Sequence, residues 1–228
     1  MIAAVVQARM SSVRLPGKVL RRIGEQTTLE YLLERLERSR LADLVVVATS
    51  TDASDDPVAA LCEQRGVACH RGPLSDVARR YLEVVERFSL DAFVRVTGDS
   101  PLLDQRLVDR GIELFRAGEW DLVTNVFPST FASGHSLEVV RAATFQEGYA
   151  LMSEPDHFEH VTTFFYENPE RFRIHNFESD RDESGTDVSL DTEEDARLIS
   201  AMIALMNRPH WEYDYDGVME LYGTLRAS

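Results

Sequence analysis

After Met1 the sequence reads Ile2-Ala-Ala-Val-Val-Gln7, and Ala8-Arg-Met-Ser-Ser-Val-Arg-Leu-Pro-Gly-Lys18 follows directly. The first stretch is almost continuously apolar, which is typical of a strand buried on both faces of a parallel sheet. The second stretch is basic, contains two serines and holds a Pro-Gly pair, which predicts a loop. In open α/β sheets, ligands bind at the carboxyl ends of the strands, so this loop is the first candidate for a ligand site.

The same alternation of apolar and amphipathic segments continues along the chain. We predict further strands at residues 44–49, near Ala68, and at 92–97, 122–125, 136–140, 172–177 and 188–190. We predict helices at residues 28–38, 56–65, 76–88, 103–117, 142–151, 157–167, 193–206 and 217–226. In the first helix the leucines recur at helical spacing, and we expect the charged residues on its other face. Strands that alternate with helices indicate an α/β fold with a mostly parallel sheet.

The length and composition fit one domain. The chain has 228 residues, of which 44% are hydrophobic and 28% are charged, which is enough to bury a substantial core. No repeat or low-complexity linker divides the sequence. The pattern of short strands changes after residue 125, so we expect residues 127–180 to form a small inserted lobe within a single domain over 1–228.

The charge and the cysteines limit the classes of partner. The formal net charge of −15 repels phosphate backbones, which argues against nucleic acid as a partner. No run approaches the ~18 apolar residues of a membrane helix, and Gln7 and Arg9 interrupt the apolar start, so we expect neither a membrane span nor a secretory signal. Cys62 and Cys69 are too few for a disulfide framework. We therefore expect a cytoplasmic protein.

The loop after the first strand carries the clearest chemical signal. Arg9, Arg14 and Lys18 can neutralise phosphate oxygens, while Ser11 and Ser12 allow backbone N–H groups to approach them closely. The spacing matches neither the P-loop nor the glycine-rich dinucleotide motif. Two interpretations stay open from chemistry alone, namely a loop that cradles phosphate and an ordinary basic turn.

Two aspartates follow predicted strands. Asp99 lies in Arg95-Val-Thr-Gly-Asp-Ser-Pro101, and Asp191 lies in Val188-Ser-Leu-Asp-Thr-Glu-Glu-Asp195. Carboxylates at such positions suit Mg²⁺, which prefers oxygen ligands and bridges proteins to substrate phosphates. Both aspartates also fit a simpler role as turn or helix N-cap residues, with Thr192 or Glu194 completing a capping pattern at the second.

A family resemblance connects these features. The sequence resembles the sugar-activating cytidylyltransferases, which include the Kdo and acylneuraminate enzymes. It is most similar to the spore-coat-polysaccharide type of this family, and the matching segments appear in the same order along the chain. The matching segments are Gln7-Ala-Arg9, Arg14-Leu-Pro-Gly-Lys18, Arg71-Gly72, Arg95-Val-Thr-Gly-Asp-Ser-Pro101, Glu159-His-Val-Thr162, Glu167-Asn-Pro-Glu-Arg-Phe-Arg173 and Leu190-Asp-Thr-Glu-Glu-Asp195.

The resemblance implies a Rossmann-like three-layer nucleotidyltransferase fold, a CTP donor, Mg²⁺ as cofactor, release of pyrophosphate and a homodimer. It implies a metal site at Asp99 and Asp191, and catalytic roles for Arg14, Lys18 and Asp99. The nucleotide-binding residues we expect are Gln7, Ala8, Arg9, Ser11, Ser12, Arg14, Lys18, Arg71, Thr97 and Gly98. The acceptor-binding residues we expect are Arg95, Asn125, Glu138 and His160, and the inserted lobe would shape the acceptor pocket and a dimer interface.

The sequence departs from the family pattern on the acceptor side. A Gly-x-Asp-x-Glu element reads Gly134-His-Ser-Leu-Glu138, and Asp187 stands where a basic residue is expected. A sugar-like acceptor therefore follows from the resemblance, but its identity does not. Two alternatives stay open: a nucleotide-sugar glycosyltransferase, for which Asp180-Arg-Asp182 and Asp214-Tyr-Asp216 have the spacing of a metal-binding pair, and a non-catalytic nucleotide-binding protein.

Overall fold

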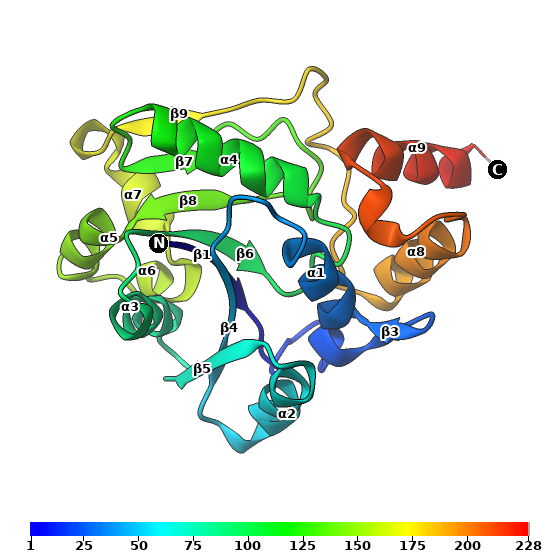
Figure 1. Cartoon of the computed structure of the whole chain (residues 1–228), viewed down its shortest axis with the longest axis horizontal. Coiled ribbons are helices and arrows are strands. Elements are labelled where there is room, and N and C mark those ends of the chain that lie inside the picture. The colour runs from blue at the N-terminus through cyan, green and yellow to red at the C-terminus, as the bar shows by residue number, and fades with distance from the viewer. Residues whose placement is uncertain (228) are drawn as a thin grey trace.

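Seven strands form a mixed, mostly parallel sheet in the computed structural model, which describes residues 1–227 (Figure 1). The strands lie in the order β5-β4-β1-β6-β8-β7-β9, and β8 runs antiparallel to both of its neighbours. Their bounds are β1 Ile2–Gln7, β4 Leu44–Ser50, β5 Ala68–Gly72, β6 Ala92–Thr97, β7 Leu122–Thr124, β8 Glu138–Arg141 and β9 Ile174–Asn176. A separate hairpin, β2 Arg22–Ile23 with β3 Gln26–Thr27, was not expected from the sequence.

Helices cover both faces of the sheet, which confirms the three-layer, Rossmann-like arrangement (Figure 1). On one face lie α1 Thr28–Leu36, α2 Asp56–Arg65 and α4 Gln105–Ala117. On the other lie α3 Val77–Phe88, α5 Ala142–Tyr149, α6 Pro155–His160 and α7 Thr163–Glu167. Beside the sheet, α8 Glu193–Ala204 and α9 Tyr215–Arg226 share a third apolar cluster with the hairpin. Within residues 1–227, no helix combines the length and the apolar character needed to cross a membrane.

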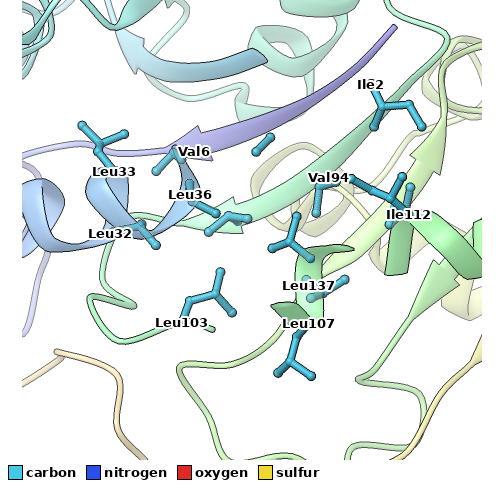
Figure 2. Close-up of a cluster of buried hydrophobic side chains, with 14 of the residues drawn as sticks. Ile2, Val6, Leu32, Leu33, Leu36, Val94, Leu103, Leu107, Ile112 and Leu137 are labelled. Atoms are coloured by element: carbon cyan, nitrogen blue, oxygen red, sulfur yellow. The ribbon is translucent and has the colours of Figure 1, made fainter. Parts of the chain in front are cut away.

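The first strand shows why its sequence is apolar throughout. Successive strand residues point to opposite faces, so Ile2 and Val6 enter the core below α1 and α4, while Val5 enters the core below α3. Figure 2 shows Val6 beside the leucines of α1, and Val94 of the adjacent strand β6 beside Ile112 of α4. Because both faces are buried, a polar residue at any of these positions would lose its hydration, and the continuous apolar run follows.

Two predicted elements are wrong. The helix expected at 157–167 is divided into α6 and α7 at Val161, whose backbone angles (φ 54°, ψ −51°) are not helical. The N–H of Thr162 bonds to the carbonyl of His160 at 2.5 Å, which makes a tight γ-turn at this point. The strand expected at 188–190 is instead an extended connection. Its backbone N–H groups bond to two different loops and not to one neighbouring strand: Val188 donates to the carbonyl of Ser133, and Leu190 donates to the carbonyl of Asp99.

The expectation that charged residues of α1 face solvent fails at Arg35. This side chain is fully buried and donates to the carbonyls of Leu103 at 2.7 Å and Tyr213 at 2.5 Å, and also to that of His210. Burial lowers the pKa of Arg35 to about 10, so it stays charged at neutral pH. The guanidinium thereby ties α1 to the loop that precedes α4 and to the segment that precedes α9.

We expect Arg35→Met to lower the free energy of unfolding by about 3 kcal/mol or more. The substitution would leave three buried carbonyls without donors, and each unpaired buried group costs ~1–3 kcal/mol. Urea denaturation followed by circular dichroism measures this change. Arg197→Met is the matched control, because Arg197 is exposed on α8 and should change stability by less than about 0.5 kcal/mol. Equal stability of the two variants would contradict a structural role for Arg35.

Candidate active site

A cavity of about 350 Å³ opens at the carboxyl ends of β1 and β6. These two strands are parallel neighbours, and their last residues, Gln7 and Thr97, stand side by side in register. The cavity brings together most of the residues singled out in the sequence. Its lining includes Gln7, Arg9, Ser11, Ser12, Arg14, Lys18, Arg95, Thr97, Gly98, Asp99, His160 and Asp191, together with Val13, Val19 and Glu159.

The basic loop is anchored by a buried carboxylate. Asp55, which is fully buried after β4, accepts the N–H of Met10 at 2.6 Å and the N–H of Ser50 at 3.2 Å. The carbonyl of Met10 in turn accepts the N–H of Gly17 at 2.9 Å, where the chain adopts a left-handed conformation (φ 75°) that favours glycine. The loop is therefore held near both ends, while its basic side chains face the cavity.

The β6 loop is pressed against the end of β1. A Cβ atom on Gly98 would lie 3.0 Å from the carbonyl oxygen of Gln7, so only glycine allows this approach without a shift. The next residue, Asp99, accepts the N–H of Leu190 at 2.8 Å through its carbonyl. This backbone bond places Asp191 beside Asp99 although the two are far apart in sequence.

Lys18 joins the two aspartates. Its Nζ donates to Asp191 Oδ1 at 2.6 Å and to Asp99 Oδ2, and the side chain is largely buried. Burial alone would lower the pKa of Lys18, but the two carboxylates outweigh this effect and raise the pKa above its usual value. Arg14 donates to the other oxygen of Asp191 at 2.7 Å. Lys18 is also the single lysine of the sequence, since every other basic side chain apart from the histidines is arginine.

Neither aspartate is a helix cap. Thr192 is the N-cap of α8, where its hydroxyl accepts the N–H of Asp195 and the Asp195 carboxylate reciprocates. Asp104 is the N-cap of α4. The capping interpretation of Asp99 and Asp191 is therefore wrong, and both carboxylates face the cavity.

The third cation of the loop also has a partner. Arg9 forms a two-pronged ion pair with Glu159 of α6, in which Nη1 lies 3.2 Å from Oε2 and Nη2 bonds to Oε1. Sequence reasoning did not single out Glu159 as a site residue, although it begins the family-like segment Glu159-His-Val-Thr162. Three cations of the basic loop thus meet three carboxylates, and the fourth cation of the lining, Arg95, pairs with the buried Glu138, so the charges around the cavity are balanced.

Four of the expected site residues lie outside the cavity lining. Ala8 is buried directly after β1, and Arg71 pairs with Asp56 and donates to the carbonyls of Ser50, at the end of β4, and Asp52. The side-chain amide of Asn125 is buried and bonds to the backbone at His135 and Leu137. These residues shape the loops around the site.

Glu138, the fourth expected site residue outside the lining, is buried behind the cavity wall. It accepts Arg95 Nη1 at 2.8 Å, the hydroxyl of Thr162 at 2.6 Å and that of Tyr166 at 3.1 Å. Burial and the nearby Glu138 carboxylate raise the pKa of Tyr166 well above its usual range, so it stays a donor. Arg95 Nε also donates to the side-chain oxygen of Gln7 at 3.2 Å. Glu138 therefore fixes Arg95, which does line the cavity.

The donor set suits a hard divalent cation. The carboxylates of Asp99 and Asp191 converge on one point, the Nζ of Lys18, so they are close enough to share a cation. Within residues 1–227 no group of three or more His, Cys, Asp or Glu side chains forms a complete metal cage. Two carboxylates that leave the remaining positions to water and substrate phosphates are the usual arrangement for Mg²⁺, so the residues fit the ion.

The two Asp-x-Asp pairs lie elsewhere. Asp180, Asp214 and Asp216 line a separate surface cavity of about 310 Å³ with Arg106, Arg110 and Arg181. Asp214 is the N-cap of α9, and Asp216 pairs with Arg181. The lining of the cavity beyond β1 and β6 includes none of these aspartates.

Comparisons with known proteins identify the family of this chain. The profile of the family described as Cytidylyltransferase matches residues 3–212. The spore coat polysaccharide biosynthesis protein SpsF of Bacillus subtilis is 31% identical over 219 residues, which cover 88% of this chain and 85% of SpsF. A cytidylyltransferase structure from Leptospira borgpetersenii superposes with a TM-score of 0.94 at 31% identity, over 99% of this chain and 95% of that one.

A more distant structure, CMP:2-keto-3-deoxy-manno-octonic acid synthetase complexed with CTP, superposes with a TM-score of 0.69 at 19% identity, over 89% of this chain and 98% of that one. At this identity the likeness shows the shared fold alone. The family match spans most of the sequence, including the loop after β1, the loop after β6 and Asp191. The chain is a nucleotidyltransferase and belongs to the cytidylyltransferase family.

Proposed function

We propose that the protein transfers CMP from CTP to a hydroxyl or phosphate oxygen of a sugar-like acceptor, with Mg²⁺ and with release of pyrophosphate. The observation that carries the proposal is the convergence of Asp99, Asp191 and Lys18 beside the basic loop. This arrangement combines a cation-binding carboxylate pair with side chains that neutralise phosphate. The family description Cytidylyltransferase agrees with CTP as donor, and the name of SpsF agrees with a role in polysaccharide biosynthesis.

In this reaction an acceptor oxygen attacks the α-phosphorus of CTP, and the bond from that phosphorus to the bridging oxygen of pyrophosphate breaks. Little covalent chemistry is required of the protein, because positioning and charge neutralisation dominate such transfers. Arg9, Arg14 and Lys18 would bind the triphosphate together with the N–H groups around Ser11 and Ser12. Lys18 and Arg14 would also stabilise the negative charge that develops on the departing pyrophosphate.

The charge balance of the cavity supports a requirement for a cation. Since the three cations of the loop and Arg95 are already matched by carboxylates, a bound triphosphate would add net negative charge. Mg²⁺ held by Asp99 and Asp191 would supply the missing positive charge at the α-phosphate. Lys18 would then turn from the aspartates toward the phosphates.

The acceptor would bind on the side of the cavity formed by Arg95 and His160, because these are the expected acceptor residues that line it. Asn125 and Glu138 would act indirectly, by fixing loops and Arg95. We further propose that residues 127–180 form the lobe for acceptor binding and dimerisation. The homodimer and the cytoplasmic location stay predictions from the sequence.

The test is a pyrophosphate-release assay with Mg²⁺ and each of the four nucleoside triphosphates, run against sugar acids, sugar phosphates and polyol phosphates. We expect release with CTP and one class of acceptor only, at least about tenfold faster than with the other nucleotides. Release of CMP-linked product is checked by mass spectrometry. Tight binding of CTP without turnover on any acceptor would favour a binding protein, and transfer of a sugar from a nucleotide sugar would favour the glycosyltransferase alternative.

A further inference from the structure

The ion pair between Arg9 and Glu159 engages a side chain that is proposed to bind phosphate. Arg9 belongs to the loop proposed to bind triphosphate, yet both prongs of its guanidinium bond to the Glu159 carboxylate. A carboxylate bound in this two-pronged way resembles a phosphate in charge and in the spacing of its oxygens. A phosphate group that takes over both Nη positions of Arg9 would therefore have to displace Glu159.

The pair is exposed enough to exchange. About a third of each side chain is open to solvent, and both side chains line the cavity. Partly exposed ion pairs contribute little net stability, whereas a triphosphate offers Arg9 a more highly charged partner.

The backbone under Glu159 is held firmly. Val161, two residues further on, is fully buried in the γ-turn, and such a conformation is strained for a β-branched residue. The hydroxyl of Thr162 is bound to Glu138, which also holds Arg95. Strained backbone persists where surrounding contacts determine it, and here it keeps Glu159 and His160 at the cavity.

We infer that Glu159 is an exchangeable ligand of the site: it holds Arg9 before nucleotide binds, and it binds hydroxyl groups of the acceptor afterwards. A carboxylate freed next to a triphosphate is repelled by it, so its stable partners are hydrogen-bond donors on the other substrate. Sugar hydroxyls are such donors. This inference rests on the proposed function, because it takes Arg9 as a phosphate ligand.

The test uses Glu159→Gln with inorganic tripolyphosphate and CTP as probes, titrated by calorimetry at fixed Mg²⁺. The glutamine keeps the size but removes the competing charge, so we expect both probes to bind about fivefold more tightly than to the unmodified protein. In turnover, the KM for the acceptor should rise about fivefold while the KM for CTP falls. Loss of a merely structural contact would not move the two constants in opposite directions.

Asp156→Asn is the matched control, because it removes one negative charge from the same helix at an exposed position outside the cavity lining. It should leave the affinity for both probes within about twofold. If the unmodified protein binds the probes and Glu159→Gln binds them no more tightly, this inference is overturned and the proposed function stands. If the unmodified protein binds neither probe, the proposed function fails as well.

Discussion

Asp99→Asn is expected to lower kcat for CMP transfer by about 10³ or more while the protein stays folded. Asparagine has nearly the same shape, but it removes one of the two charges that would hold Mg²⁺. It also removes the charged partner of Lys18 on the β6 loop. Pyrophosphate release at saturating CTP and acceptor measures the loss, and thermal unfolding should show a change of only a few degrees.

The matched control for this variant is Asp180→Asn. Asp180 is an exposed acidic residue of an Asp-x-Asp pair and lines the separate cavity near α9. Its substitution should leave kcat within about twofold. Near-normal turnover by Asp99→Asn would refute the metal assignment. A large loss of turnover in Asp180→Asn would indicate that the separate cavity near α9 takes part in the reaction.

The parts of the fold that are set by local pattern were predictable. The bounds of β1, β6 and α2 agree with the sequence prediction, because each segment has a strong apolar or helical pattern with a clear end. The basic loop and Asp99 were found for the same reason, since each follows such a strand directly. Their roles came from the family resemblance.

The parts set by contacts between distant segments were not predictable. Glu159 meets Arg9 across 150 residues, and Arg35 meets carbonyls near the opposite end of the chain. The break at Val161 depends on burial of its side chain and on the bond from Thr162 to Glu138, neither of which leaves a turn signal such as glycine or proline. Likewise, the segment 188–190 is apolar enough for a strand, but its hydrogen-bond partners are loops.

Lys18→Met is expected to act in two opposite directions. Turnover should fall by about 10²–10³, because the transition state loses a cation beside the departing pyrophosphate. Binding of Mg²⁺ should become stronger, because Lys18 sits between the two carboxylates and competes with the ion for them. Calorimetric titration with Mg²⁺ and the rise of the unfolding temperature with Mg²⁺ measure the second effect, and turnover assays measure the first.

Lys18→Arg separates charge from geometry. An ammonium group is a compact charge that can donate to two carboxylates at one point, whereas a guanidinium is planar and larger. Apart from histidine, every other basic side chain of the sequence is arginine. The single lysine lies between the two aspartates, where a compact charge can contact both carboxylates. We therefore expect Lys18→Arg to recover less than about a tenth of the lost turnover. Full recovery by arginine would mean that Lys18 contributes only its charge. Unchanged Mg²⁺ affinity in Lys18→Met would mean that Lys18 does not compete with the metal ion.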